Sequence, residues 1–221
     1  DEGLGRASVN TDLEKAIRLA IPRLMLPEVL AQVDAMGKAS VADRVLLELC
    51  GEHGTAEYAL RVARWRFSQR GEPRLREEAY RRALEAVPNS VTVQDLERLE
   101  RLLDRKPVDP VETAKVLDGE PANVDFRLTH ALALLQAGRS AEARFTLEPC
   151  EAIKHQLQPG QKAVVVAILA ATGSRSEAIA LVRTMKSAHL TDAEYRLVYE
   201  LTNVQKRDIR SPQEKGDESD E

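Results

Sequence analysis

Aromatic residues are scarce in this chain of 221 residues, where Phe, Trp and Tyr together make up 4%. Strands of β-sandwiches and β-barrels are usually rich in aromatic and β-branched side chains, so the composition argues against both architectures. A long apolar run is also missing. The longest, at positions 163–171, is about half of the roughly 18 to 20 residues that a membrane-spanning helix needs. We therefore expect no membrane contact within this sequence.

Cysteine is equally rare, and the two residues, Cys50 and Cys150, lie far apart in the chain. This spacing is not a disulfide framework, so we expect both to be small buried thiols. Strict alternation of apolar and polar residues, the pattern of a half-buried strand, does not extend beyond positions 91–93. The sequence thus predicts essentially no β-sheet.

The net charge of −4 is concentrated at the C-terminal end, where positions 213–221 hold five acidic residues and one lysine. The remainder is neutral overall, which weakens the case for bulk electrostatic capture of nucleic acid. Because positions 213–221 contain no apolar residue to bury, we expect a disordered acidic tail, placed at 207–221. We also expect a disordered N-terminus at 1–8.

Four glycines form a regular lattice: Gly37, Gly71, Gly138 and Gly173 lie at intervals of 34, 67 and 35 residues. The long interval skips one unit, and Arg105 occupies the skipped position. Glycine can end a helix in the left-handed conformation without a steric clash, so the lattice predicts turns between paired helices. A period near 34 residues is typical of a helical repeat protein.

The residues around the lattice align in four columns, one at four positions before the glycine and three at five, nine and twelve positions after it. These columns are Val33, Phe67, Leu134 and Leu169; Ala42, Arg76, Ala143 and Ala178; Leu46, Tyr80, Leu147 and Val182; and Leu49, Ala83, Cys150 and Met185. The apolar columns form one stripe on each helix, and the small residues allow the paired helices to approach closely. One hairpin cannot bury such a stripe alone, so the copies are expected to stack.

This pattern resembles the tetratricopeptide repeat family, whose unit is 34 residues long. The best match is 57–90, where Gly71, Tyr80, Ala83 and Pro88 stand at positions at which that family favours Gly, an aromatic residue, Ala and Pro. The other units fall at about 23–56, 91–123, 124–158 and 159–193. The resemblance implies an all-α, right-handed superhelical solenoid of about five helix hairpins. With capping helices at 9–21 and 192–206, the expected solenoid forms a single domain over 9–206.

The unit at 91–123 is degenerate, because it lacks the glycine and has Arg101 where an apolar residue is expected. A shift of one residue restores its stripe through Leu99 and Leu102. Pro149 falls within the second helix of the unit at 124–158, so we expect a bend or a break there.

Three sequence signals predict helix starts. Thr92 and Thr191 each precede an acidic residue by three positions, which is the spacing of a capping box. Asp109 precedes a proline, as is typical of the first turn of a helix.

No group of residues indicates catalysis or metal binding. Cys50 and His53 form a single Cys-x-x-His pair without the second pair that zinc requires. Cys150 and His155 are close enough for a nucleophile and a base, but Cys150 fills an apolar column of the repeat. We therefore expect no enzyme activity, no metal and no cofactor.

The segment from Arg61 to Arg82 holds eight arginines and three glutamates, with Trp65, Phe67 and Tyr80 among them. Three interpretations remain open. The first is a solvated helix face balanced by Asp95, Glu97, Glu100 and Asp104 of the next unit. The second is a surface for an anionic protein partner, since arginine binds carboxylates bidentately. The third, least favoured, is a surface for RNA or single-stranded DNA, whose bases stack on aromatic residues.

In the family that the chain resembles, the first helix of each unit lines a concave groove that binds peptides. Carried over to this sequence, the groove residues would be Tyr58, Arg61, Trp65, Ser68, Thr92, Asp95, Leu99, Asp125 and Leu132. Ala163, Ala167 and Ala170 would form a smooth continuation of small residues.

We therefore expect a non-catalytic scaffold that binds a partner protein or peptide in this groove. The alternatives are nucleic-acid binding through Arg61–Arg82, and a regulatory or assembly module of a longer, membrane-anchored protein. The compartment stays open between the cytoplasm and, if an N-terminal segment was removed, an exported or membrane-tethered state.

Overall fold

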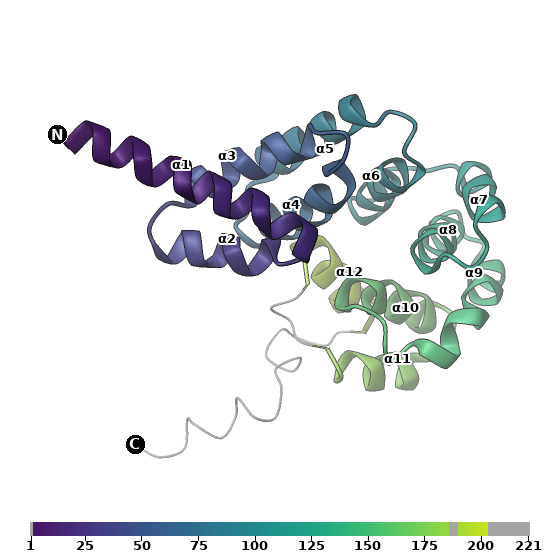
Figure 1. Ribbon diagram of the computed structural model, residues 1–221. Coiled ribbons are helices and arrows are strands. Elements are labelled where there is room, and N and C mark those ends of the chain that lie inside the picture. Colours follow the sequence, from purple (N-terminus) through teal and green to yellow (C-terminus); the bar gives the residue numbers. More distant parts are fainter. Residues whose placement is uncertain (1, 186–189, 203–221) are drawn as a thin grey trace, which may run out of the picture. The chain divides into compact units, whose positions relative to one another are not determined.

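The computed structural model describes residues 2–185 and 190–202, with side chains from position 10 onward except at 201. These residues form helices, and none of them lies in a β-strand, as the composition predicted. By its contacts the chain divides into two compact units, 1–94 and 95–221, with the boundary inside helix α6 (Figure 1).

The first unit contains α1 (Glu2–Ala20), the short 3-10 helix η1 (Ile21–Arg23), α2 (Leu26–Ala35), α3 (Ala39–Cys50), α4 (Ala56–Gln69), α5 (Pro73–Ala86) and the first turn of α6 (Val91–Leu103). Helix α3 packs against α1, α2, α4 and α5. The largest fully buried side chains of this unit, among them Ile17, Leu30, Leu46 and Phe67, come from four different helices. The unit therefore has a hydrophobic core of its own.

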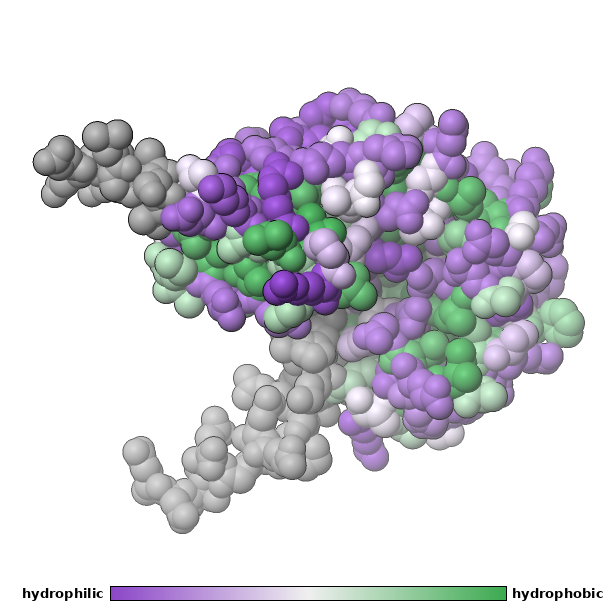
Figure 2. Space-filling view, viewed as in Figure 1, coloured by the Kyte–Doolittle hydropathy of each residue, from purple (hydrophilic) through white to green (hydrophobic). Residues whose placement is uncertain are grey.

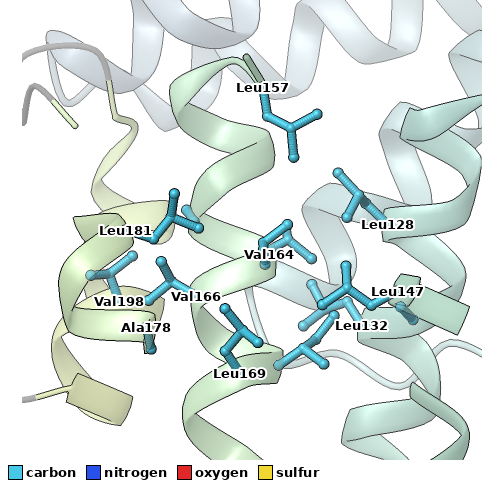
Figure 3. Close-up of a cluster of buried hydrophobic side chains, with 14 of the residues drawn as sticks. Leu128, Leu132, Leu147, Leu157, Val164, Val166, Leu169, Ala178, Leu181 and Val198 are labelled. Atoms are coloured by element: carbon cyan, nitrogen blue, oxygen red, sulfur yellow. The ribbon is translucent and has the colours of Figure 1, made fainter. Parts of the chain in front are cut away.

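The second unit contains the rest of α6, α7 (Pro110–Gly119), α8 (Val124–Gln136), α9 (Ser140–Leu147), the 3-10 helix η2 (Glu148–Ile153), α10 (Pro159–Ala171), α11 (Arg175–Val182) and α12 (Asp192–Thr202). Helix α10 is its centre, because α8, α9, α11 and α12 all pack against it. Figure 3 shows Leu128, Leu132 and Leu147 on one side of α10 and Leu181 and Val198 on the other. Residues 163–169 are all buried, as expected of a helix that is apolar on every side.

Five helices end in the same way. A residue with a left-handed backbone follows α2, α4, α6, α8 and α10, namely Gly37, Gly71, Arg105, Gly138 and Gly173, with φ between 59° and 90°. In each case the next residue donates its N–H to the carbonyl five positions earlier, as Lys106 does to Arg101 at 2.8 Å. This bond defines the Schellman motif. Arg105 thus has the conformation that glycine has at the four other turns.

The turn at Arg105 is longer than the others. Three residues separate the helices at each glycine turn, at 36–38, 70–72, 137–139 and 172–174, whereas six residues, 104–109, separate α6 from α7. Arg101 is exposed and Leu102 is buried. Leu102 is buried as the one-residue shift of the stripe predicts, but Leu99 is only partly buried, and the turn residue Arg105 keeps the unshifted position of the lattice.

The repeat columns are the cores of the two units. Every residue of the three apolar columns exposes at most 8% of its surface, and Ala42, Ala143 and Ala178 are fully buried. Arg76, the large residue in the column of alanines, is half-buried, and its guanidinium donates to Ser68 Oγ at 3.3 Å. The periodic pattern therefore identified the buried faces correctly.

The small residues of α10 do not line an open groove. Ala163 and Ala167 are fully buried and Ala170 is partly buried. They share a face of α10 with Gly160, against which the carboxylate of Glu194 in α12 lies. Because small side chains let helices approach closely, we interpret this face as the packing surface for α12, which corrects the prediction of a smooth groove.

The ends of the chain differ in part from the prediction. Helix α1 begins at Glu2, so it takes in the segment 2–8 for which we expected disorder. At Pro149, α9 has already ended and the chain continues as the 3-10 helix η2, as expected for a proline. The last positions of the predicted closing helix, 203–206, and the acidic tail lie outside the described residues.

Two of the three predicted helix starts have the expected capping hydrogen bonds. Asp109 accepts a hydrogen bond from the N–H of Val111 at 2.9 Å, and Thr191 forms a capping box with Glu194. Thr92 does not cap α6. The hydroxyl of Ser90 does so instead, accepting from the N–H of Val93 at 3.2 Å.

None of the described helices combines the length and the apolar composition needed to cross a lipid bilayer.

Candidate functional site

A groove in the second unit is the clearest candidate for a binding site. It has a volume of about 580 Å³ and lies between the end of α6 with the turn after it, the C-terminal half of α8, and α12. Leu132, Leu135 and Leu197 give it an apolar lining. We call this space the α6–α8–α12 groove.

Arg105 stands at the edge of this groove with a backbone conformation that is unfavourable for its residue type. The left-handed region costs a residue with a Cβ atom about 1–2 kcal/mol, and the four corresponding turns avoid the cost with glycine. The side chain of Arg105 reaches across the groove edge to α12, where its guanidinium pairs with the carboxylate of Glu200. Strained residues of this kind are found preferentially at functional sites.

The charges around the groove are of both signs, but the cations are the more exposed. The side chain of Arg105 is 71% exposed and that of Lys106 is 62% exposed, against 41% for Glu200 and 26% for Asp104. Arg196 also lines the groove, is exposed, and forms no ion pair with another described residue. Because Arg105 pairs with Glu200 and Lys106 pairs with Asp104 at 3.6 Å, Arg196 gives the groove its excess of positive charge.

Helix α12 is anchored at its start. The N–H of Thr191 donates to Glu194 Oε2 at 2.8 Å, and the N–H of Glu194 donates to Thr191 Oγ1 at 3.2 Å. Glu194 is 3% exposed and lies against Gly160, near the N-terminus of α10. Its negative charge suits that position, because the N-terminus of a helix carries partial positive charge. This anchor holds α12 in place as one wall of the groove.

The opposite wall is held by hydrogen bonds between α6 and α8. Gln136 Nε2 donates to the carbonyl of Leu102 at 2.6 Å, and Thr129 Oγ1 donates to Asp95 Oδ2 at 2.9 Å. Both bonds join residues that are 34 positions apart, so the two helices lie in the register of the repeat.

The predicted groove residues of the second unit have different roles. Leu132 lines the α6–α8–α12 groove as expected, although its side chain is fully buried. Asp95 is also buried and is committed to the hydrogen bond from Thr129. Leu99 packs against the hydrophobic core, and Asp125 accepts from Gln161 Nε2 of α10 at 2.7 Å.

In the first unit, Arg61 and Trp65 are the most accessible of the predicted groove residues. Trp65 is 39% exposed and Arg61 is exposed, while Tyr58 and Thr92 are partly buried. Burial raises the pKa of the Tyr58 hydroxyl. Ser68 is 5% exposed and accepts from Arg76, so it belongs to the interior and not to a contact surface.

At least four of the eight arginines in the segment from Arg61 to Arg82 form ion pairs within their own unit. Arg66 is 6% exposed, forms a bidentate pair with Asp34 at 2.6 and 2.7 Å, and donates through Nε to Asp43 at 2.8 Å. The hydrogen bonds from Arg66 lower the pKa of Asp34. Arg70 also donates to Asp43, at 2.8 Å. These bonds tie α4 to α2 and α3.

The outer face of α5 is balanced by its own glutamates, in a region where Figure 2 shows a hydrophilic surface. Arg81 pairs with Glu78 and Glu85 at 2.6 Å, and Arg82 pairs with Glu78 at 2.6 Å. The hydrogen bonds from the two arginines lower the pKa of Glu78 to about 2. The acids that balance Arg66, Arg70, Arg81 and Arg82 are therefore on α2, α3 and α5. Pairing of this kind leaves less positive charge for nucleic acid than the sequence suggested.

The two thiols are buried, as expected. Burial raises the pKa of Cys50 to about 12 and also raises that of Cys150, so neither is a ready nucleophile. Among the described residues, no group of three or more His, Cys, Asp or Glu side chains is arranged to hold a metal ion.

The sequence interpretation missed Arg105, Leu135, Arg196 and α12 as parts of the groove. Arg105 carried a signal, because it was the residue at the position where the lattice lacks a glycine. Arg196 and Leu197 carried none, since the helix predicted at 192–206 was interpreted only as a capping helix.

No protein-family model, curated protein sequence or solved structure matches this chain.

Proposed function

We propose that this chain is a non-catalytic interaction module that binds a segment of a partner protein in the α6–α8–α12 groove. The partner segment carries an apolar side chain next to a carboxylate. The apolar side chain contacts Leu135 and Leu197, and the carboxylate pairs with Arg196 and Lys106. Arginine is among the residue types that contribute most to binding at interfaces.

The observation that carries this proposal is the left-handed backbone of Arg105 at the edge of the groove. At the four equivalent turns the chain has glycine, which is the unstrained choice. Residues in such conformations cluster at binding sites. Of the two described non-glycine residues with a positive φ, Leu24 and Arg105, only Arg105 lines this groove.

The proposal extends to the fold as a whole: a solenoid of about five hairpins similar to tetratricopeptide repeats. The shared helix ending at five turns and the hydrogen bonds between residues 34 positions apart support it. In the first unit, Tyr58, Arg61 and Trp65 would provide a second contact surface, since the last two are accessible on α4.

The test uses the whole chain as bait for a random peptide display library. A selected peptide is then labelled, and its Kd is measured by fluorescence anisotropy for the wild type, for Arg196→Glu and for Lys115→Glu. Both substitutions reverse one exposed positive charge in the same unit, but Lys115 lies on α7, outside the residues that line the groove.

We expect Arg196→Glu to weaken binding at least tenfold and Lys115→Glu to change it less than twofold. The proposal is wrong if no acidic peptide is enriched, or if both variants weaken binding equally. In the second case the attraction would depend only on total charge.

A further inference from the structure

The described part of the chain ends two residues beyond the groove lining, at Thr202, which is buried and whose carbonyl accepts from Arg175 of α11 at 3.2 Å. Helix α12 lines the α6–α8–α12 groove through Ala193, Arg196, Leu197 and Glu200, and its last residue is Thr202. The positions that follow, 203–221, are therefore attached two residues after Glu200, the last groove-lining residue of α12.

The final positions have the opposite charge to the most exposed side chains of the groove. Positions 213–221 contain Glu214, Asp217, Glu218, Asp220 and Glu221 and one lysine. The groove presents Arg105, Lys106 and Arg196, of which Arg105 pairs with Glu200 and Lys106 pairs with Asp104 at 3.6 Å. Its lining therefore carries one more positive than negative charge, and Arg196 is the cation that offers it. Electrostatic complementarity of this kind selects and orients a binding partner.

The acidic positions can reach the groove without strain. Asp217 lies 15 residues beyond Thr202, and 15 residues of polypeptide can span at most about 50 Å. From Thr202 back to Ala193, α12 covers only about 14 Å, at 1.5 Å per residue. A segment tethered at this distance has an effective concentration on the order of millimolar, so a contact with a Kd of about 1 mM or tighter is populated.

We propose that the acidic tail, positions 213–221, docks onto Arg105, Lys106 and Arg196 of the same molecule and competes with the partner segment for the groove. This inference rests on the function proposed above, because it describes how that site is regulated. A partner must then displace the tail, and modification or removal of the tail activates binding.

The first arm of the test detects docking without any partner. A water-soluble carbodiimide joins a carboxylate to a lysine amine only when the two are in contact. In the full-length protein at low salt, mass spectrometry should find at least three times more crosslinks between the tail and Lys106 than between the tail and Lys115. These crosslinks should decrease at 0.5 M NaCl and in the variant Arg196→Gln. Equal yields at the two lysines, or none at Lys106, would overturn the inference.

The second arm measures competition. In a full-length variant the five acids of the tail are changed to Gln or Asn, which keeps the length of the chain. The selected peptide should bind this variant three to ten times more tightly than the wild type. If this variant binds the peptide with unchanged affinity and binding still depends on Arg196, the tail does not compete for the groove. The proposed function is then still supported. Crosslinks at Lys106 in a protein that binds no peptide have the opposite meaning: docking stands and the proposed function fails.

Discussion

At the scale of single residues, the most informative contrast is between Arg105 and the glycines of the other four turns. All five have the same backbone conformation and are followed by the same hydrogen bond. Of these five turns, only the one at Arg105 has the backbone strain of a non-glycine residue in the left-handed conformation. This turn lies at the edge of the groove.

This contrast gives a prediction that separates stability from binding. Arg105→Gly and Arg105→Ala both remove the ion pair with Glu200, but only glycine relieves the left-handed backbone. We expect the glycine variant to exceed the alanine variant by about 1 kcal/mol in free energy of unfolding, measured by urea denaturation. Both should bind the selected peptide more weakly than the wild type, by a similar factor.

Two results would contradict this interpretation of Arg105. If the glycine variant is no more stable than the alanine variant, the backbone is not strained in solution. If the glycine variant binds the peptide as tightly as the wild type, the arginine side chain has no part in recognition.

Residue patterns predicted the buried faces well and the surface contacts poorly. The apolar columns, including Val33, Phe67 and Leu134, are buried because burial of apolar area dominates the energetics and repeats with the helix period. The pairing of Arg66 with Asp34 and Asp43 could not be predicted. It joins residues from three helices, and no local sequence rule determines which acid lies near a given arginine.

At the scale of helices, the lattice predicted where they end but not how α10 and α12 would pack. The small residues of α10 were interpreted as an open surface, whereas Glu194 of α12 lies against Gly160. A column of small residues permits either a groove or the close approach of another helix, and the sequence alone does not distinguish the two.

The contact between Gly160 and Glu194 is testable. A Cβ atom at position 160 would lie 2.5 Å from Glu194 Oε1, so Gly160→Ala must displace a carboxylate that caps α12. We expect a loss of about 1 kcal/mol, the typical effect of losing a cap, in thermal denaturation.

A double-mutant cycle with Glu194→Ala provides the control for this prediction. Once the carboxylate is absent, Gly160→Ala should cost nothing or be slightly stabilising, since alanine has the higher helix propensity. An equal loss in both backgrounds would show that the two residues are not coupled and that α12 is held in another way.

At the scale of the whole molecule, the chain has two units with separate cores, although its sequence repeat runs through both. In an ideal repeat protein each copy interacts only with its neighbours, and cooperativity depends on the interfaces between copies. The degenerate unit at 91–123 contains the boundary, as well as the long turn at Arg105. A weak point in the repeat pattern therefore coincides with the division of the fold.

Separate cores predict two unfolding transitions. The single tryptophan, Trp65, belongs to the first unit, so its fluorescence reports on that unit, while far-UV circular dichroism reports on both. Leu132 is fully buried in the second unit and Leu46 in the first, and truncation of such a leucine costs about 2–5 kcal/mol. We expect Leu132→Ala to lower the urea midpoint seen by circular dichroism and to leave the Trp65 midpoint unchanged, whereas Leu46→Ala lowers the Trp65 midpoint. Coincident shifts of both signals in both variants would mean that the repeats unfold as one cooperative stack, since non-coincident probes are the signature of more than two states.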